Sequence, residues 1–277
     1  MARTITLAHS PDSDDAFMFY ALAKGKVDAR GLEFKHVLED IQTLNEKAAQ
    51  GVYDITAISF HAYYKVRGKY LLTGSGASVG DGYGPVIVSR RPLTRQDLDE
   101  ATVAVPGELT TAFLVFRLYA PSARWKVIPF DKIQEAVGKG DIDAGILIHE
   151  GQLTYRDQKL HRVVDLGEWW KLGTGLPLPL GGNAIRRDLD LKTAAACCDV
   201  IHDSVKYALD HKKEALDYAL TYGRGMDRAR ADKFVGMYVN GFTLELGKRG
   251  EDAVAELFRL GHEAGIIPVR VEPEFMD

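Results

Sequence analysis

An alternation of strand-like and helix-like segments constrains the fold of this chain most strongly. Apolar runs typical of strands occupy residues 4–8, 32–38 and 53–58. Each run is followed by a turn and then by residues with helical spacing. Alternation of this kind is typical of α/β proteins, in which helices cover a mostly parallel sheet. We therefore predict the α/β fold class.

The pattern then restarts further along the chain. Strand-like runs return at residues 102–105, 125–129 and 144–148, with helical stretches between them. Beyond Asn183 the spacing is mostly helical. Two α/β units followed by helices indicate that the chain builds one lobe, crosses to a second and returns to complete the first. Hinged two-lobed folds bind small molecules in the cleft between the lobes.

This interpretation gives specific lobe boundaries. We expect a larger α/β lobe of residues 1–90 together with 178–277, and a smaller α/β lobe of residues 91–177. The two connections, and hence the hinge, should be Ser89–Leu93 and the Gly/Pro-rich stretch Gly173–Gly182. A single doubly wound domain remains the alternative, because periodicity alone does not exclude it.

Composition and charge narrow the function. Hydrophobic residues make up 46% and charged residues 27% of the chain, and the formal net charge is −4. Nucleic-acid and membrane-surface proteins need clustered basic residues, which are missing, so we expect no nucleic-acid or membrane partner. The cysteines, Cys197 and Cys198, are adjacent and unsuited to a disulfide. With no apolar leader pattern, these features predict a cytoplasmic protein.

Polar residues follow two of the predicted strands. Ser10 begins a loop with Asp12, Asp14 and Asp15 between the first strand and a helix. Ser59 lies where the 53–58 strand meets the next helix. Ligands of open α/β sheets gather at the carboxyl ends of strands. Helix capping explains these residues equally well, but three acids in four residues exceed what a cap needs.

A third strand ends in a Pro-Gly turn and two threonines. Thr110, Thr111 and Ala112 open the helix that follows the strand at 102–105. The N–H groups at a helix start, with a threonine hydroxyl, suit a carboxylate or phosphate. An ordinary threonine cap is the alternative. The Gly-Lys-Ser/Thr element of a Walker loop is absent.

His149 is the strongest candidate for acid–base chemistry. It follows the buried strand at 144–148 and precedes Glu150 and Gly151. The alternative is that His149 has a purely structural role. His9, which also lies at a strand tip, is the closest rival of His149 as the acid–base residue. Glu150 either orients His149 or faces solvent.

Neither the histidines nor the glycines match a cofactor motif. Metal-ligand spacing such as H-E-x-x-H is absent. The glycine-rich stretch Gly74–Gly84 fails the dinucleotide spacing and precedes a strand. We interpret it as a flexible loop at the mouth of the cleft, and we predict neither a metal nor an organic cofactor.

Several of these segments together carry a family resemblance. They are Ser10-Pro11 with Asp14-Asp15, Leu38-Glu39-Asp40, Val105-Pro106-Gly107 with Thr110-Thr111-Ala112, Ile148-His149-Glu150, Thr174 to Gly181, and Tyr238-Val239-Asn240. On these residues the chain resembles the 1,4-dihydroxy-6-naphthoate synthases of the futalosine route to menaquinone, nearly end to end. Many members read Ser-Pro-Cys-Pro-Asn-Asp at the first motif, so Asp14 stands here in place of the more usual Asn.

The resemblance implies a type II periplasmic-binding-protein fold and a lyase. Its substrate would be cyclic dehypoxanthinyl futalosine, with His149 as the base. Ser59, Thr111 and Ala112 would surround a bound hydroxy acid or substrate, and no cofactor would be needed. We assign Ser10, Asp14, Ser59, Thr110, Thr111 and Ala112 to a substrate carrying a carboxylate, in a monomer or homodimer. The alternatives are chorismate dehydratase of the same pathway and a non-catalytic binding protein for a small organic anion.

Overall fold

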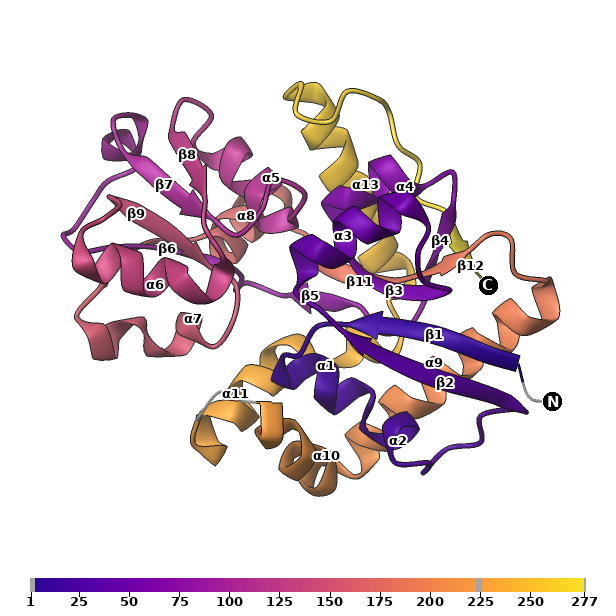
Figure 1. Ribbon diagram of the computed structural model, residues 1–277. Helices are drawn as coiled ribbons and strands as arrows, with labels where there is room; N and C mark the ends of the chain where they lie inside the picture. Colours follow the sequence, from indigo (N-terminus) through magenta and orange to yellow (C-terminus); the bar gives the residue numbers. More distant parts are fainter. Residues whose placement is uncertain (1–2, 223–225, 277) are drawn as a thin grey trace.

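The computed structural model describes residues 3–222 and 226–276, and within them the strands form two separate sheets (Figure 1). The larger, seven-stranded sheet has the order β12-β4-β11-β3-β1-β2, with β5 paired to β11. Its strands are β1 (Arg3–His9), β2 (Leu32–Leu38), β3 (Ile55–Ser59), β4 (Tyr70–Thr73), β5 (Ser78–Gly80), β11 (Leu178–Arg186) and β12 (Phe275–Met276).

The smaller, five-stranded sheet has the order β10-β6-β9-β7-β8. Its strands are β6 (Val86–Ser89), β7 (Thr102–Val105), β8 (Arg124–Val127), β9 (Ala144–Leu147) and β10 (His161–Asp165). We call residues 3–85 with 175–276 the first lobe and residues 86–174 the second lobe, excluding the undescribed residues 223–225.

Helices cover both sheets. In the first lobe they are α1 (Ser13–Met18), α2 (Tyr20–Ala23), α3 (Ile41–Gln50), the short η1 (Phe60–Ala62), α4 (Tyr63–Val66), α9 (Leu191–Asp210), α10 (Lys212–Ala219), η4 (Leu220–Tyr222), α11 (Arg228–Tyr238), α12 (Gly241–Leu244) and α13 (Gly247–Glu263). In the second lobe they are η2 (Gln96–Asp99), α5 (Thr111–Tyr119), α6 (Phe130–Lys139), α7 (Gly151–Thr154), η3 (Tyr155–Gln158) and α8 (Leu166–Thr174). The α/β class predicted from the alternation is confirmed.

One predicted boundary was wrong. Strand β6 was expected to end the first lobe, but it pairs with β9 and β10 in the second sheet. Ser89 therefore lies within that sheet, opposite Ala144 and His161, and Ser89–Leu93 is no connection between lobes. The chain crosses instead at residues 81–85, and it returns at 175–177, inside the predicted Gly173–Gly182 stretch. The β6 strand was misplaced because local spacing does not reveal its pairing partner.

The glycine-rich segments also contain more regular structure than expected. The Gly74–Gly84 stretch, predicted to be a flexible loop, contains β5, and residues 178–182 begin the long strand β11. Gly181 needs its small size there, because a Cβ atom would come within 2.9 Å of the Ile58 carbonyl oxygen on the paired strand β3. Glycine in these segments serves close strand packing.

The two lobes share part of one hydrophobic core. Buried residues of α13, including Leu257 and Phe258, belong to the same cluster as Val105 of β7 and Leu114 of α5. Figure 1 shows α13 beside α5 where the lobes meet. Because separating packed apolar surface is costly, this contact restricts how far the lobes can move apart at α5.

No helix within residues 3–222 and 226–276 is long and apolar enough to span a membrane.

Candidate active site

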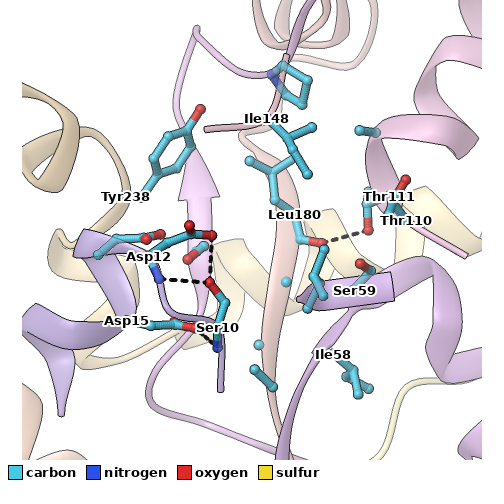
Figure 2. Close-up of a pocket in the computed structure, with 18 of the residues that line it drawn as sticks. Ser10, Asp12, Asp15, Ile58, Ser59, Thr110, Thr111, Ile148, Leu180 and Tyr238 are labelled. Carbon is cyan, nitrogen blue, oxygen red and sulfur yellow. Dashed lines mark hydrogen bonds between the residues drawn. The ribbon is translucent and has the colours of Figure 1, made fainter. Parts of the chain in front are cut away.

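A cavity of about 130 Å³ lies between the lobes, at the carboxyl ends of strands from both sheets. Figure 2 shows two opposite walls, with Leu180 and Ile148 between them. The lining residues are Ser10, Asp12, Asp14, Asp15, Ile41, Ala57, Ile58, Ser59, Gly76, Ser78, Pro85, Thr110, Thr111, Ala112, Ile148, Leu180, Gly181, Gly182 and Tyr238. The structure thus brings Ser10, Asp14, Ser59, Thr110, Thr111 and Ala112 together around one space.

The start of α5 forms the first wall, and its threonine hydroxyls are already engaged. Thr110 caps the helix: its Oγ1 accepts from the Phe113 N–H at 3.2 Å and donates to the Gly107 carbonyl at 2.7 Å. The Thr111 hydroxyl donates to the Leu180 carbonyl at 2.6 Å. Since a hydroxyl has one hydrogen, neither threonine has a side-chain donor left for a ligand.

The main chain of α5 supplies the free donors instead. Among the described residues, the N–H groups of Thr111 and Ala112 have no hydrogen-bond partner. Both residues line the cavity, at the positive end of the helix dipole. Two such N–H groups side by side suit a carboxylate.

Ser59 adds a third donor to this wall. Its N–H donates to Oδ1 of Asn45 at 2.8 Å, and Nδ2 of Asn45 donates to the Ser59 Oγ at 3.1 Å. Asn45 lies on α3, is fully buried, and fixes the serine with both ends of its amide. The oxygen of Ser59 is thereby an acceptor, so its own hydrogen remains for a ligand in the cavity. Sequence reasoning missed Asn45, because a polar residue on a helix gives no local sign of its partner.

The loop after β1 forms the opposite wall, which is acidic. Asp15 accepts the Ser10 N–H at 2.7 Å, and Asp12 accepts the Ser10 hydroxyl at 2.5 Å. Asp14 lines the cavity, and no other described residue forms a hydrogen bond or an ion pair with its carboxyl. Neither Asp14 nor Asp15 caps α1: the residue at the cap position is Asp12, and its side chain makes no capping hydrogen bond.

Burial and the crowding of carboxyl groups change the pKa values of Asp14 and Asp15 in this wall. Burial raises the pKa of Asp14 well above its usual value, and Asp15, Asp12 and Glu150 raise it further. Burial also raises the pKa of Asp15 to about 7, against the lowering effect of the Ser10 N–H. A wall of this kind retains protons near neutral pH, so part of it acts as a hydrogen-bond donor.

Two hydrogen bonds, one from α1 and one from α11, join the first lobe to the second lobe near this wall. The Ser13 hydroxyl donates to Oε1 of Glu150 at 3.4 Å, and the Tyr238 hydroxyl donates to Oε1 of Gln152 at 2.6 Å. Burial raises the pKa of Tyr238, so its phenol keeps its proton. Glu150, which is buried, therefore does not face solvent. Tyr238 and Glu150 were not among the predicted binding residues, because α11 and α7 meet only in the folded chain.

His149 lies beside the cavity rather than in its lining. Its neighbour Ile148 lines the cavity, while the imidazole is held by main-chain groups of the second lobe. Nδ1 accepts the Gly151 N–H at 3.0 Å, and Nε2 is 3.1 Å from the Phe130 carbonyl oxygen, to which it must donate. The ring is therefore neutral in this arrangement. An oxygen of Glu150 lies 3.6 Å from Nδ1.

The rival histidine, His9, is buried in a different arrangement. Its Nδ1 is 3.0 Å from the Ser10 carbonyl oxygen, and its Nε2 is 3.0 Å from Nδ1 of His36. Burial lowers the pKa of His9 to about 3, with a further contribution from His36. His9 does not line the cavity and is occupied in supporting the Ser10 loop.

The donor set of the cavity also bears on metals. Over the described ranges, no three or more His, Cys, Asp or Glu side chains are grouped so that they could hold a metal ion.

Comparison with solved structures identifies the fold. A crystal structure of an Archaeoglobus fulgidus protein is 46% identical, with a TM-score of 0.92 over 95% of this chain and 98% of that chain. An alkanesulfonate-binding protein from Xanthomonas axonopodis, bound to MOPS, is 11% identical, with a TM-score of 0.77 over 98% and 96%. A Candida albicans protein described as having the generic periplasmic binding protein fold is 12% identical, with a TM-score of 0.75 over 98% and 95%. The chain has this two-lobed fold, as predicted.

Comparison of sequences identifies the family. The model of a family described as menaquinone biosynthesis matches residues 5–263. A Thermus thermophilus protein named 1,4-dihydroxy-6-naphthoate synthase is 40% identical over 272 residues, 98% of this chain and 99% of the relative. A Streptomyces coelicolor protein of the same name is 36% identical over 274 residues, 96% of each. With enzymes of this kind as relatives over almost its whole length, the chain is an enzyme and belongs to the menaquinone biosynthesis family.

Proposed function

We propose that this chain is a lyase that converts cyclic dehypoxanthinyl futalosine to 1,4-dihydroxy-6-naphthoate. One observation carries the proposal: at one wall of the cavity between the lobes, two main-chain N–H groups and one hydroxyl hydrogen have no partner within the described residues. That arrangement suits an aromatic carboxylate. The reaction is taken from the name of the relatives at 40% and 36% identity.

In this proposal the substrate carboxylate lies against the start of α5. The N–H groups of Thr111 and Ala112 and the hydroxyl of Ser59 donate to it. The hydroxyl-bearing, sugar-derived part then lies toward Ser10 and Asp14. Tyr238 and the apolar lining, which includes Ile148, exclude water from the reacting bonds.

We propose His149 as the general base. Its neutral imidazole takes the proton of a substrate hydroxyl, and carbon–carbon cleavage then releases the sugar-derived fragment. Aromatisation of the new ring favours the products. To act in this way, the ring must exchange its bonds to Phe130 and Gly151 for the substrate. Asp14 is the competing base, since its carboxyl already lines the cavity.

Product analysis tests this function directly. The protein is incubated separately with the cyclic futalosine derivative and with chorismate, and products are identified by mass spectrometry. Formation of 1,4-dihydroxy-6-naphthoate supports the proposal. Dehydration of chorismate would assign the sibling reaction. Tight binding of the cyclic compound without turnover would indicate a binding protein.

The site also bears on assembly. We propose that the protein acts as a monomer or a homodimer, with the cavity lined by residues of both lobes of a single chain. A role in biosynthesis agrees with the cytoplasmic location expected from the sequence.

A further inference from the structure

His61 lies directly behind the start of α5. It belongs to η1 in the first lobe, is 2% exposed, and does not line the cavity. Its ring packs against the rings of Tyr64 and Phe113, with centroids 5.5 Å and 6.4 Å away. A phenylalanine would fill such an aromatic environment equally well, so packing alone does not explain a histidine here.

The hydrogen bonds of His61 are directed at two residues of the α5 start. Its Nδ1 lies 3.2 Å from the carbonyl oxygen of Thr110, the cap of α5. A carbonyl only accepts, so Nδ1 carries the hydrogen. The main-chain N–H of His61 donates to Oγ1 of Thr111 at 3.1 Å. One first-lobe residue thus holds the last residue before the helix and the first residue within it.

The second ring nitrogen of His61, Nε2, is buried and lacks a hydrogen bond to any described residue in this arrangement. An unpaired buried polar atom destabilises the fold, and such atoms in native proteins call for a functional explanation. Burial lowers the pKa of His61 to about 4, so the ring stays neutral and its single hydrogen stays on Nδ1.

We propose that His61 is a positioning residue, which fixes the α5 start so that the free N–H groups of Thr111 and Ala112 face the carboxylate beside Ser59. The hydrogen bond from Nδ1 of His61 to the Thr110 carbonyl joins the two lobes. It therefore sets the position of the α5 N–H groups, in the second lobe, relative to the Ser59 hydroxyl, in the first. The carboxylate half of the cavity is therefore assembled before any ligand enters. Only the identity of the ligand as a carboxylate rests on the proposed function.

Three variants separate this role from packing. Asn places an amide N–H where Nδ1 stands, Gln places it nearer the position of Nε2, and Phe keeps the ring without the donor. We would measure binding of 2-naphthoate and of neutral 2-naphthamide by calorimetry. His61→Phe and His61→Gln should weaken 2-naphthoate about fivefold to tenfold, the size of one neutral hydrogen bond, and leave 2-naphthamide unchanged. His61→Asn should restore most of the loss.

Several results would overturn the positioning role of His61 or the carboxylate site on which it acts. Unchanged 2-naphthoate binding by His61→Phe would overturn the proposal, as would equal losses for both ligands or a failure of His61→Asn to recover. Absence of 2-naphthoate binding by the unmodified protein would remove the carboxylate site itself. Should the variants fail to fold, long-range ¹H–¹⁵N NMR of the unmodified protein decides: hydrogen on Nδ1 of His61 supports the proposal, and hydrogen on Nε2 refutes it.

The same assays keep this inference distinct from the proposed function. A protein that shows the predicted 2-naphthoate pattern but does not convert the cyclic substrate retains the positioning role and loses the lyase assignment. A protein that turns over the cyclic substrate should show the effect of His61→Phe mainly in KM, because positioning a remote carboxylate affects binding more than the reacting bonds.

Discussion

The two walls of the cavity stand at equivalent places in the fold but present opposite chemistry. Each follows a parallel strand and opens a helix, α1 after β1 and α5 after β7. At α5 the threonine hydroxyls bond to main-chain groups, and the N–H groups of Thr111 and Ala112 have no partner within the described residues. At α1 the side chains are carboxyls, and one of them, Asp14, lines the cavity without bonding to any other described residue. The strand-end position therefore makes a site, and local hydrogen bonding decides which end of a ligand it takes.

The largest expected effect comes from His149, the proposed base, whose rival Asp14 belongs to the acidic wall. His149→Ala should reduce kcat by about 10²–10⁴-fold while leaving 2-naphthoate binding intact, because a positioned base contributes that much. Single-turnover kinetics with the cyclic substrate measure it. Near-normal rates in His149→Ala, with a severe loss in Asp14→Asn, would move the base to the acidic wall.

A matched pair of serines compares the walls directly. Within residues 3–222 and 226–276 the hydroxyl hydrogen of Ser59 has no acceptor, whereas the Ser10 hydroxyl donates to Asp12. Ser59→Ala should weaken 2-naphthoate by about 1.5–3 kcal/mol, the range for a hydrogen bond to a charged group. Ser10→Ala should change carboxylate affinity little. Calorimetry on both variants checks this, and equal losses would mean that the carboxylate does not distinguish the walls.

Thr111→Val sharpens the description of the α5 wall. A hydroxyl that donated directly to the carboxylate would be worth about 1.5–3 kcal/mol of affinity. Here it donates to Leu180 instead, so we expect a loss of only about 0.5–1.5 kcal/mol, through looser positioning. A loss in the higher range would show that Thr111 turns its hydroxyl to the ligand.

Asp14→Asn tests the electrostatics of the acidic wall without removing a hydrogen bond to another described residue. A raised pKa means that the folded chain holds a proton which the unfolded chain has released, so wild-type stability falls as the pH rises above 3.8 toward the raised value. The variant should gain Tm relative to wild type at pH 8 and little at pH 4. Asp97→Asn is the control with opposite sign, because hydrogen bonds from Thr94 lower the pKa of Asp97. A Tm difference between Asp14→Asn and wild type that does not change with pH would contradict the raised pKa of Asp14.

The smallest effect concerns relative motion of the walls. We propose that ligand closes the lobes about residues 81–85 and 175–177. The core shared by α5 and α13 keeps the lobes together at one side, so the change should be modest. Small-angle scattering with and without product should show a slight decrease in the radius of gyration. An unchanged radius would argue against closure, and a large decrease would contradict the shared core.

The sequence predicted strand-tip residues better than their roles. Local spacing predicts the α/β class and the return of the chain to the first lobe. It also places Ser59, Thr110 and Asp14 at strand ends, and in the structure these three residues line one cavity. Local spacing could not show that the Thr111 hydroxyl donates to the Leu180 carbonyl, because β11 lies far along the chain. Nor could it pair β6 with β9 or Asn45 with Ser59, because those partners are chosen by tertiary packing.

A crystal structure with bound 1,4-dihydroxy-6-naphthoate tests the account most directly. The product carboxylate should lie about 2.7–3.2 Å from the main-chain nitrogens of Thr111 and Ala112 and from Oγ of Ser59. Its hydroxylated ring should point toward Asp14 and the loop after β1. A carboxylate bound instead among Asp12, Asp14 and Asp15, or a product bound outside this cavity, would contradict the assignment of the two walls.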